Sequence, residues 1–470
     1  MDVSMSSGTR RAVFDLLRTR HAGWDAIERR RRARLGAILR HAHERSPLYR
    51  QLWGERPGAG DLSSLPVVTK PQLMEHFDEL VTDREVRRRD VDAFLADPGN
   101  IGHPFLGRYL VATTSGTSGH PGVFMQDELA RTVSGAIPRV RGGLTSWYGP
   151  RGALRFMLSG RRYALLDVAG GPYSALVHAE WARREEPGLE HSLRFVNVLN
   201  SIDEQVAELS EFKPRALGGY PSAVLLMARE QAAGRLHIEP MFIVLVGETV
   251  TSATRRVIET TFNCRTYEEY GSGEHGALAV QCREGWLHYS ADWFVLEPVD
   301  EQYQPVPAGT RSHTVLITNL MNGLMPFIRY DQGDSVLLSP EPCPCGSAFP
   351  AIRVTGRKND LLDLPGRDAQ RTVTIAPLSL ITVIEETPGL YRAQVIQTAP
   401  GTLEIRLQTV PGTAPEDAWP QLSERLRTYL DRQGVGAIEL RLSTDPPQQH
   451  PNSGKYEQVI RSEPHTAPKA

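Results

Sequence analysis

The stretch Thr113–Gly122 reads TTSGTSGHPG, and the prediction of the fold starts from it. The run Arg108–Ala112 before it is rich in β-branched and aromatic residues and predicts a short strand. Apolar residues at helical spacing predict a helix over residues 127–140 after it. Glycines let such a loop turn its N–H groups inward and hydroxyls add donors, so the loop suits phosphate. The alternative is a surface linker, and no Gly-Lys-Ser/Thr closes the loop as in a Walker A motif.

Composition sets limits on the class of protein. The chain has 470 residues, 40% hydrophobic and 23% charged, which is enough for a large core and more than one domain. A net charge of −2 gives no electrostatic case for nucleic acid, and no run of 18 apolar residues predicts a membrane span. Four cysteines and a polar N-terminus indicate a cytoplasmic protein without a disulfide framework. We therefore expect neither nucleic acid nor membrane as a partner.

Strands and helices alternate after the loop, which predicts an α/β sheet with helical crossovers and ligand sites in the loops after the strands. The expected strands are Leu154–Leu158, Tyr163–Val168, Leu193–Val198, Ala216–Gly218, Phe242–Val246 and Cys264–Tyr270. The expected helices are Ile202–Phe212, Ser222–Ala233 and Ser252–Phe262.

A change of pattern near residues 358–362 predicts a second domain. Beyond it we expect a strand over residues 392–397, a strand over 403–409, a helix over 415–432 and a strand over 438–442. This small α+β unit is close to the usual size of a domain. The predicted division is therefore 1–360 for the large domain and 361–470 for the small one.

Five motifs occur in the order known from one superfamily. They are TTSGTSGHPG, then YGSGE at Tyr270–Glu274, YDQGD at Tyr330–Asp334, GRKND at Gly356–Asp360 and NSGK at Asn452–Lys455. From about His41 to Lys455 the chain resembles the adenylate-forming (acyl-CoA synthetase) superfamily, and most of all its phenylacetate-CoA ligase-like family. The resemblance implies a large domain with mixed and parallel sheets that binds ATP and the acid, and a small mobile C-terminal lid. It also implies ATP-dependent formation of an acyl adenylate with release of pyrophosphate.

A carboxylate on a glycine-rich turn can bind Mg²⁺ beside phosphates, and the resemblance gives this role to Glu274. One carboxylate can accept from both ribose hydroxyls, and by resemblance Asp334 does so, although Asp331 replaces the arginine inside the family motif. For each motif alone, a surface turn is the alternative. The residues expected at ATP or AMP are Thr114, Ser115, Gly116, Thr117, Ser118, Gly119, Glu248, Glu269, Tyr270, Gly271, Asp334 and Arg357.

The resemblance also implies the catalytic groups. Lys455 would cross into the site and stabilise charge as the carboxylate attacks the α-phosphate, with Glu274 and His120 beside it. His120 stands where the family has a lysine, and a neutral imidazole supplies less charge. Asn359 stands at the hinge position, where the family usually has aspartate. An exposed tail lysine is the alternative for Lys455.

Three cysteines and a histidine form a separate candidate. Cys282 and His288 are close in sequence, and Cys343 and Cys345 share a tight turn. Three thiolates and one imidazole complete a tetrahedral zinc site, and some relatives in the resembled family carry zinc on a similar arrangement. The alternative is that the three thiols and the histidine bind no metal. We predict a structural Zn²⁺ ion.

The acid and its acceptor are less constrained by the sequence. The expected pocket residues are Tyr148, His178, Trp181, Tyr220 and Gly271, and the aromatic rings suit an aryl acid as well as they suit ordinary core packing. By resemblance the acceptor is the thiol of CoA. The segment 364–370 lacks the glycine-rich text of CoA-dependent members, so CoA stays one option and an amine acceptor the other. Three further alternatives stay open. The substrate is an unusual oxyacid, or the protein binds a nucleotide without turnover. The protein is also a possible homodimer.

Overall fold

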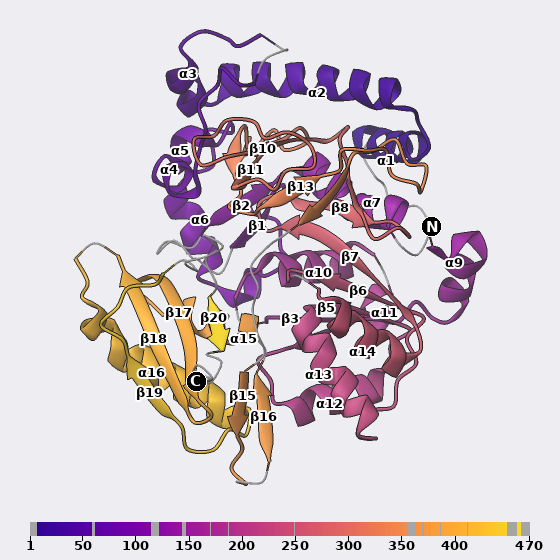
Figure 1. Ribbon diagram of the computed structural model, residues 1–470. Helices are drawn as coiled ribbons and strands as arrows, with labels where there is room; N and C mark the ends of the chain where they lie inside the picture. Colours follow the sequence, from indigo (N-terminus) through magenta and orange to yellow (C-terminus); the bar gives the residue numbers. More distant parts are fainter. Residues whose placement is uncertain are drawn as a thin grey trace, which may run out of the picture.

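The computed structural model describes residues 7–58, 62–113, 122–142, 147–169, 171–186, 188–248, 250–354, 362–368, 371–375, 377–385, 387–410, 412–448 and 458–461. A large α/β body, indigo to orange in Figure 1, lies above a smaller orange and yellow unit built from the end of the chain. Within the described ranges, no helix is both long and apolar enough to cross a bilayer.

A nine-stranded sheet forms the centre of the body, in the order β13-β14-β9-β8-β7-β6-β5-β3-β4. The strands β4, β3, β5, β6 and β7 are parallel, and the remaining neighbours are antiparallel. This confirms the predicted α/β class. The parallel strands are β3 (Tyr163–Asp167), β4 (Leu193–Asn197), β5 (Ala216–Gly219), β6 (Phe242–Val246) and β7 (Arg265–Ser272). The antiparallel extension is β8 (Gly276–Gln281), β9 (Leu287–Tyr289), β13 (Val336–Leu338) and β14 (Ala351–Val354).

Helices connect the parallel strands because their apolar sides bury against the sheet. Leu209, Val224 and Ile258 pack in one cluster with Leu217, Ile243 and other strand residues. A capping box at Ser201, with Glu204 reaching back, starts the first of the three helices that the sequence predicted. The helices of this part are α10 (Ser174–Glu185), α11 (Leu189–Ser192), α12 (Ile202–Phe212), α13 (Pro221–Ala232) and α14 (Ser252–Phe262).

One of the predicted strands is wrong. Residues 154–158 belong to the helix α9 (Gly149–Leu158), because a proline in its first turn favours a helix and Phe156 packs edge-on against Phe242. The helix predicted over residues 127–140 is confirmed as α7 (Glu128–Arg141), and a strand that the sequence did not predict precedes it. This strand, β2 (Val123–Gln126), pairs antiparallel with β1 (Leu110–Thr113). All four residues of β2 are buried, so burial favours a core strand there.

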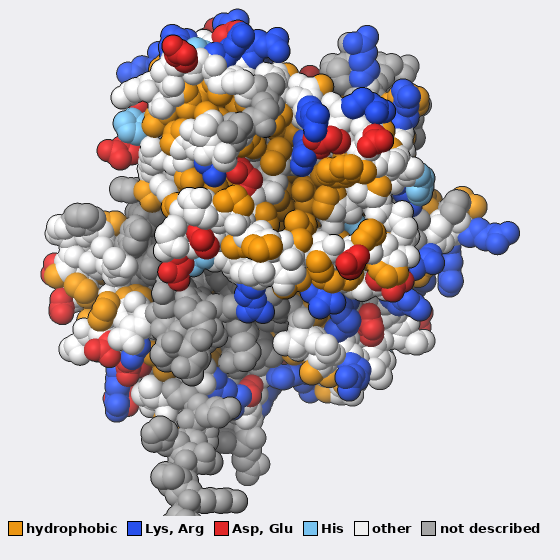
Figure 2. Space-filling model, turned by 45° about the horizontal axis from the view of Figure 1, so that its top comes forward, with side chains coloured by type: hydrophobic (Ala, Val, Ile, Leu, Met, Phe, Trp, Pro, Cys, Tyr) orange, Lys and Arg blue, Asp and Glu red, His pale blue; other side chains and the backbone are white. Residues whose placement is uncertain are grey.

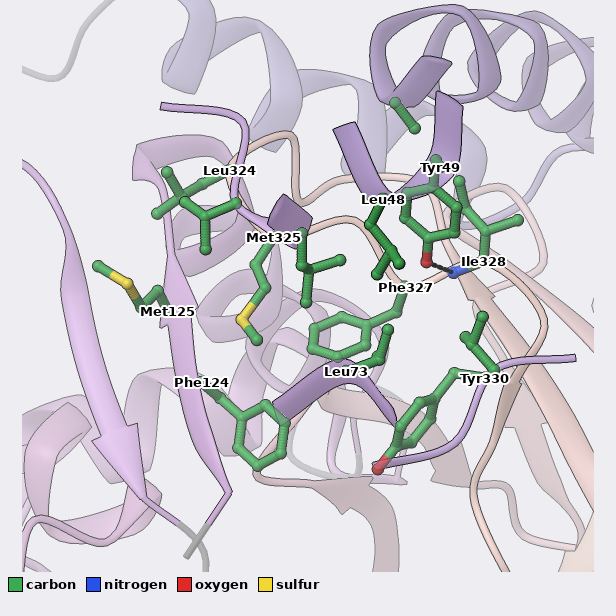
Figure 3. Packing of buried hydrophobic residues seen from close by; sticks show 14 of the residues in the cluster. Leu48, Tyr49, Leu73, Phe124, Met125, Leu324, Met325, Phe327, Ile328 and Tyr330 are labelled. Carbon is green, nitrogen blue, oxygen red and sulfur yellow. Dashed lines mark hydrogen bonds between the residues drawn. The ribbon is translucent and has the colours of Figure 1, made fainter. Parts of the chain in front are cut away.

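The N-terminal helices pack against the segment Phe327–Tyr330, which leads into the YDQGD motif. Figure 3 shows Leu48, Tyr49 and Leu73 packed against Phe327 and its neighbours. The Tyr49 hydroxyl accepts from the backbone N–H of Ile328 at 3.2 Å, which fixes the segment that leads to Tyr330. The elements are α1 (Ser7–Thr19), α2 (Trp24–Arg45), α3 (Pro47–Trp53), α4 (Lys70–Glu75), α5 (Phe77–Leu80), α6 (Arg88–Leu95) and η1 (Pro98–Asn100). Beside them lies a second sheet of β10 (Phe294–Val299), β11 (Thr314–Asn319) and β12 (Tyr330–Asp331).

The end of the chain has the predicted α+β pattern and a hydrophobic cluster of its own. Its elements are β15 (Leu362–Pro365), β16 (Thr372–Ile375), α15 (Pro377–Glu385), β17 (Leu390–Ala399), β18 (Thr402–Thr409), α16 (Pro415–Arg432), β19 (Glu439–Leu442) and β20 (Val459–Arg461). It contacts the large body beside α12, where the Gln433 side chain donates to the carbonyls of Leu199 and Asn200 at 2.9 and 3.0 Å. The division at residue 360 itself stays a prediction, since 355–361 lie outside the described ranges.

Basic and acidic side chains are interspersed over the described part of the face that Figure 2 shows. Orange hydrophobic side chains gather between them near the centre of this view. This mixed surface agrees with the formal net charge of −2.

Candidate active site

The candidate site lies where the parallel strands end. Strand register aligns Gly219 of β5 with Leu245 of β6, and Val246 of β6 with Glu269 of β7. Ligands of open α/β sheets bind at the carboxyl ends of such strands. Gly247, with a φ of +79°, follows β6, and a Cβ there would lie 2.9 Å from the ring of Tyr220. The backbone therefore turns sharply at this edge and needs glycine to do so.

Tyr270 and Asp334 come together at this edge from positions 64 residues apart. The Tyr270 hydroxyl donates to Oδ2 of Asp334 at 2.9 Å. Burial and the adjacent carboxylate both raise the pKa of the phenol, so Tyr270 stays a donor at neutral pH. A half-buried carboxylate held beside an aromatic ring can accept hydroxyl groups of a ribose. The structure thus joins two of the expected nucleotide residues, and their role at the ribose stays a prediction.

Asp331, the departure from the family motif, serves the turn itself. It accepts from Tyr303 at 2.9 Å, from Thr314 at 2.6 Å and from the backbone of Gly333 at 3.0 Å. The turn before Asp334 is therefore held by a carboxylate with three donors.

Glu274 is buried and ion-paired with Lys70. Lys70 Nζ lies 3.1 Å from Oε1 of Glu274, and the Tyr330 hydroxyl donates to the same oxygen at 3.2 Å. Burial raises the pKa of Glu274, but the charge of Lys70 outweighs it and lowers the pKa to about 2. Glu274 is therefore ionised at neutral pH.

Lys70 is the functional candidate that the sequence analysis missed. The backbone of Val68 pairs with the Arg329–Asp331 segment, accepting from Asp331 at 2.9 Å and donating to Arg329 at 3.1 Å. This pairing carries Lys70, at the start of α4, to Glu274. The sequence contains Val-Val-Thr-Lys at residues 67–70, but nothing in it indicates that Lys70 pairs with Glu274, 204 residues further along the chain.

Glu248 caps the helix α13. Its carboxylate accepts from the backbone N–H and from the hydroxyl of Ser222, both at 2.9 Å. Burial raises its pKa. Gly271 is needed where it stands, because a Cβ there would lie 2.4 Å from the carbonyl oxygen of Gly276. Glu269 precedes Tyr270 in β7 and is half-buried.

The four side chains expected in the acid pocket lie in different surroundings. Tyr148 donates to the carbonyl of Met241 at 2.9 Å and packs in a cluster with Phe242 and Tyr267. His178 Nε2 lies 2.9 Å from Oε1 of Gln126.

The other two expected side chains also have partners. Trp181 is covered by the Arg131 guanidinium, 4.2 Å from its ring centroid. Tyr220 donates to buried Asp167, and burial raises the pKa of that aspartate to about 6. Tyr148, Trp181 and Tyr220 pack against three separate hydrophobic clusters, so their shared role as one pocket stays a prediction.

Several expected residues lie outside the described ranges, so their roles stay predictions. They are Thr114, Ser115, Gly116, Thr117, Ser118, Gly119, His120, Arg357, Asn359 and Lys455.

The four expected metal ligands do meet. The ligand atoms of Cys282, His288, Cys343 and Cys345 all lie within 4.8 Å of one another. Antiparallel pairing of β9 with β14 sets His288 opposite Ala351 and so brings the turn at Cys343 close to it. The Cys282 and Cys343 sulfurs are 3.7 Å apart. Two sulfurs bound at 2.3 Å to one tetrahedral ion are separated by roughly 3.8 Å.

The histidine of this cluster is oriented for a metal. Its Nδ1 lies 2.6 Å from the carbonyl oxygen of Phe349, so Nδ1 carries the proton and donates to that oxygen. Nε2 is then a free acceptor, and it lies 3.2 Å from the Cys345 sulfur. The donor set and the tautomer both fit zinc.

Comparison with known proteins gives the following similarities. No family model matches the chain. It is 25% identical over 464 residues to the phenylacetate-coenzyme A ligase of Thermus thermophilus, covering 91% of this chain and 94% of that protein. It is 28% identical over 162 residues to protein CapK of Staphylococcus aureus, covering 33% and 34% of the two chains.

Solved structures show the same fold. The structure of 2-hydroxyisobutyryl-CoA ligase in complex with 2-HIB-AMP and CoA in the thioesterification state matches with a TM-score of 0.56. The identity is 19%, and the match covers 93% of this chain and 89% of that one. The same ligase in the postadenylation state matches with a TM-score of 0.51, over 92% and 89% of the two chains.

Proposed function

We propose that the protein activates a carboxylic acid with ATP, because it is a homologue of phenylacetate-coenzyme A ligase and has the fold of the adenylate-forming enzymes. The acid would attack the α-phosphate, pyrophosphate would leave, and the acyl adenylate would pass its acyl group to the thiol of CoA. The observation that carries this proposal is the hydrogen bond of Tyr270, at the carboxyl end of β7, to Asp334, with the ionised Glu274 in the turn that follows β7.

The described residues have distinct parts in this reaction. Asp334 would accept the ribose hydroxyls, with Tyr270 holding the carboxylate in place. Glu274 would hold Mg²⁺, since it is an ionised carboxylate in a glycine-rich turn and hard cations prefer such oxygens. When bound, Mg²⁺ neutralises charge on the phosphates. Lys70 supplies a further positive charge at Glu274, which would offset part of the charge lost where His120 replaces the family lysine.

The remaining catalytic assignments rest on the motifs alone. Lys455 would stabilise charge that develops in adenylation, and Asn359 would be the hinge about which the lid turns. The 2-hydroxyisobutyryl-CoA ligase structures are described in a postadenylation and in a thioesterification state, which supports two lid positions in this chain as well.

We propose a structural zinc ion on Cys282, His288, Cys343 and Cys345. The sulfur separation, the histidine tautomer and the convergence of two loops from different parts of the sheet support it. With four protein ligands the ion has no open position for a substrate, so it would tie the two loops together.

The proposed substrate is a carboxylic acid with an apolar side group, such as an aryl acid. The aromatic side chains of Tyr163, Tyr267 and Tyr148 on one face of the sheet support it.

The test is pyrophosphate release from ATP with a panel of acids, each assayed with CoA, with hydroxylamine as an amine acceptor, and without acceptor. We expect acid-dependent pyrophosphate, and an acyl-CoA product only when CoA is present. Asp334→Ala should lose most of the activity, while Glu301→Gln, at an exposed position outside the motifs, serves as the matched control. If product forms with hydroxylamine but not with CoA, the acceptor is an amine and not the thiol of CoA. ATP binding without pyrophosphate from any acid would indicate a nucleotide-binding protein without turnover.

A further inference from the structure

Three exposed apolar side chains lie together on one helix of the large body. On α9 the exposed fractions of Leu154, Met157 and Leu158 are 59%, 55% and 79%. Positions three and four apart lie on one side of a helix, so these side chains form an apolar stripe. Phe156, on the other side of the helix, packs edge-on against Phe242. Single exposed apolar residues are ordinary, but an adjacent group of them marks an interaction site.

The edge of this stripe is basic. Arg151 and Arg155 are exposed one turn apart along it, and Arg161 follows the end of the helix. The stretch 149–162 contains no acidic residue. Within the described ranges, none of these three arginines forms an ion pair. The apolar stripe therefore lies beside positive charge that no neighbouring carboxylate compensates.

The helix α9 projects from the large body on the side away from the candidate site. It stands at the right-hand edge of Figure 1, and Figure 2 shows basic and apolar side chains together at that edge. The Tyr148 hydroxyl, at the start of α9, donates to the carbonyl of Met241, the residue before β6. The end of α9 leads into β3 at Tyr163. Because α9 lies at the amino ends of the parallel strands, an occupant of the stripe would leave the site at their carboxyl ends open.

Charge and shape favour an anionic lipid surface over a second copy of the chain. In a symmetric dimer the same patch faces itself, so the arginines of two copies would come together and repel each other. A bilayer takes up a projecting apolar stripe at the boundary between headgroups and acyl chains, and anionic headgroups attract the arginines beside it. With ten residues α9 is too short to cross a bilayer, so it would lie in the surface.

We propose that α9 is a membrane-docking helix, which inserts its apolar stripe into an anionic lipid surface and places Arg151 and Arg155 at the headgroups. The net charge and the lack of a long apolar run gave no reason to expect a membrane, because neither reflects how side chains are arranged on one helix. The proposal does not depend on acid activation. It holds the protein at a membrane with the candidate site at the far edge of the sheet.

The test is sedimentation of the full-length protein with vesicles of phosphatidylcholine and phosphatidylserine in roughly a 3:1 ratio, compared with vesicles of phosphatidylcholine alone. We expect binding to the anionic vesicles, and weaker binding at higher salt, since salt screens the arginines. Leu154→Ser combined with Leu158→Ser should weaken binding roughly tenfold or more, because less apolar surface enters the bilayer. Arg151→Gln combined with Arg155→Gln should weaken it by about fivefold for each arginine.

The matched control is Leu106→Ser, at an apolar position outside α9 that is 47% exposed, and it should bind as the unmodified protein does. All these variants change exposed side chains outside the candidate site. Pyrophosphate release without vesicles and the midpoint of urea unfolding should therefore stay unchanged, which separates loss of docking from loss of the fold.

Other outcomes contradict the proposal. Absence of binding to the anionic vesicles would overturn it, as would equal binding to phosphatidylcholine alone or binding that the double leucine variant retains. A dimer in analytical ultracentrifugation that the double leucine variant loses, without vesicle binding, would assign the stripe to a second copy. Absence of pyrophosphate with every acid would contradict the proposed function and leave the docking of α9 to be decided by the vesicles alone.

Discussion

Asp334 shows how a single side chain in this site depends on its partner. The Tyr270 hydroxyl, 2.9 Å from Oδ2, orients the carboxylate toward the strand edge. Tyr270 and Asp334 belong to two different motifs, and neither motif alone orients the acceptor. In the proposed function, the binding of ribose therefore depends on the pair.

Replacing Asp334 by alanine removes the proposed acceptor for the ribose hydroxyls. Hydrogen bonds to a charged group contribute about 1.5–3 kcal/mol, so ATP binding should weaken by that free energy in calorimetry. Tyr270→Phe keeps the carboxylate and loses only its hydrogen bond, so it should cost less. Unchanged ATP affinity in Asp334→Ala would remove Asp334 from the nucleotide site.

The Lys70–Glu274 pair predicts a pH dependence of stability. The pKa of Glu274, about 2 in the folded protein, lies below its unfolded value of roughly 4.3. The pair therefore stabilises the fold above about pH 4.3, and this stability is lost as the pH falls through about 2. In Lys70→Met the counter-charge is gone while burial remains, so the pKa of Glu274 should rise above its ordinary value.

Lys70→Met should therefore be destabilised at neutral pH, by about 3–5 kcal/mol for a broken buried pair. Urea unfolding at pH 7 and pH 5 measures this, and the deficit relative to the unmodified protein should shrink at pH 5, where Glu274 can take up a proton. Lys70→Arg, which keeps the charge, is the control. An equal deficit at both pH values would show that the loss is one of packing and not of charge.

At the scale of elements, the register between paired strands brings together side chains that lie far apart in the sequence. The pairing of β9 with β14 sets the turn at Cys343 beside His288, and the turn after β8 adds Cys282. In the same way, the pairing of β1 with β2 sets Thr113 and Val123, at the two ends of the TTSGTSGHPG stretch, opposite each other. The apolar run at 154–158 shows the limit of local patterns, since five apolar and basic residues suit a helix or a strand until packing decides.

We predict one zinc ion per chain at the four ligands. Elemental analysis of protein purified without added metal should give about one equivalent, and Cys343→Ser should lower it. Because the ion ties two loops to the sheet, a strong chelator should lower the Tm. Cys264→Ser is the matched control, since that thiol lies outside the cluster. Folded and active protein with no zinc would contradict the site.

At the scale of the whole molecule, the small unit at the end of the chain rests against the side of the large body. Arg229 of α13 donates to Thr374 at 2.8 Å, and Arg432 donates to Asn200 at 2.9 Å. In Figure 1 this unit lies at the lower left, with α15 and β16 toward the large body. The contacts described are few and mostly polar, as at interfaces between domains that move relative to each other.

Lys455 belongs to this scale, because the lid would have to close to deliver it. If it acts only in adenylation, Lys455→Ala should leave ATP binding nearly intact and slow pyrophosphate formation by two to three orders of magnitude. A donor placed on developing charge contributes roughly 2.7–4 kcal/mol. Transfer from a synthetic acyl adenylate to the acceptor should survive, since the turned lid presents another face.

The paired measurement of the two half-reactions decides between roles for Lys455. Equal loss in both would assign it a structural role or exclude rotation of the lid. No loss in either would leave an exposed lysine at the end of the chain. Lys213→Ala, at the end of α12 and outside the motifs, serves as the control.

The sequence by itself determined the α/β class and the α+β pattern of the last hundred residues. Both follow from local signals, because apolar periodicity and turn residues act within a few positions. It also singled out candidate side chains, with Asp334 and Glu274 chosen through the motifs of the resembled family and the three cysteines through residue type and spacing. The homology and the shared fold then supported the family that the motifs indicated.

Only the tertiary structure decided which of these side chains meet. The ion pair of Lys70 with Glu274 and the hydrogen bond of Tyr270 with Asp334 join residues 204 and 64 positions apart. Strand register sets Glu269 on the face of β7 opposite Tyr270. Register and burial arise from packing across the whole sheet, so no local stretch of sequence contains them.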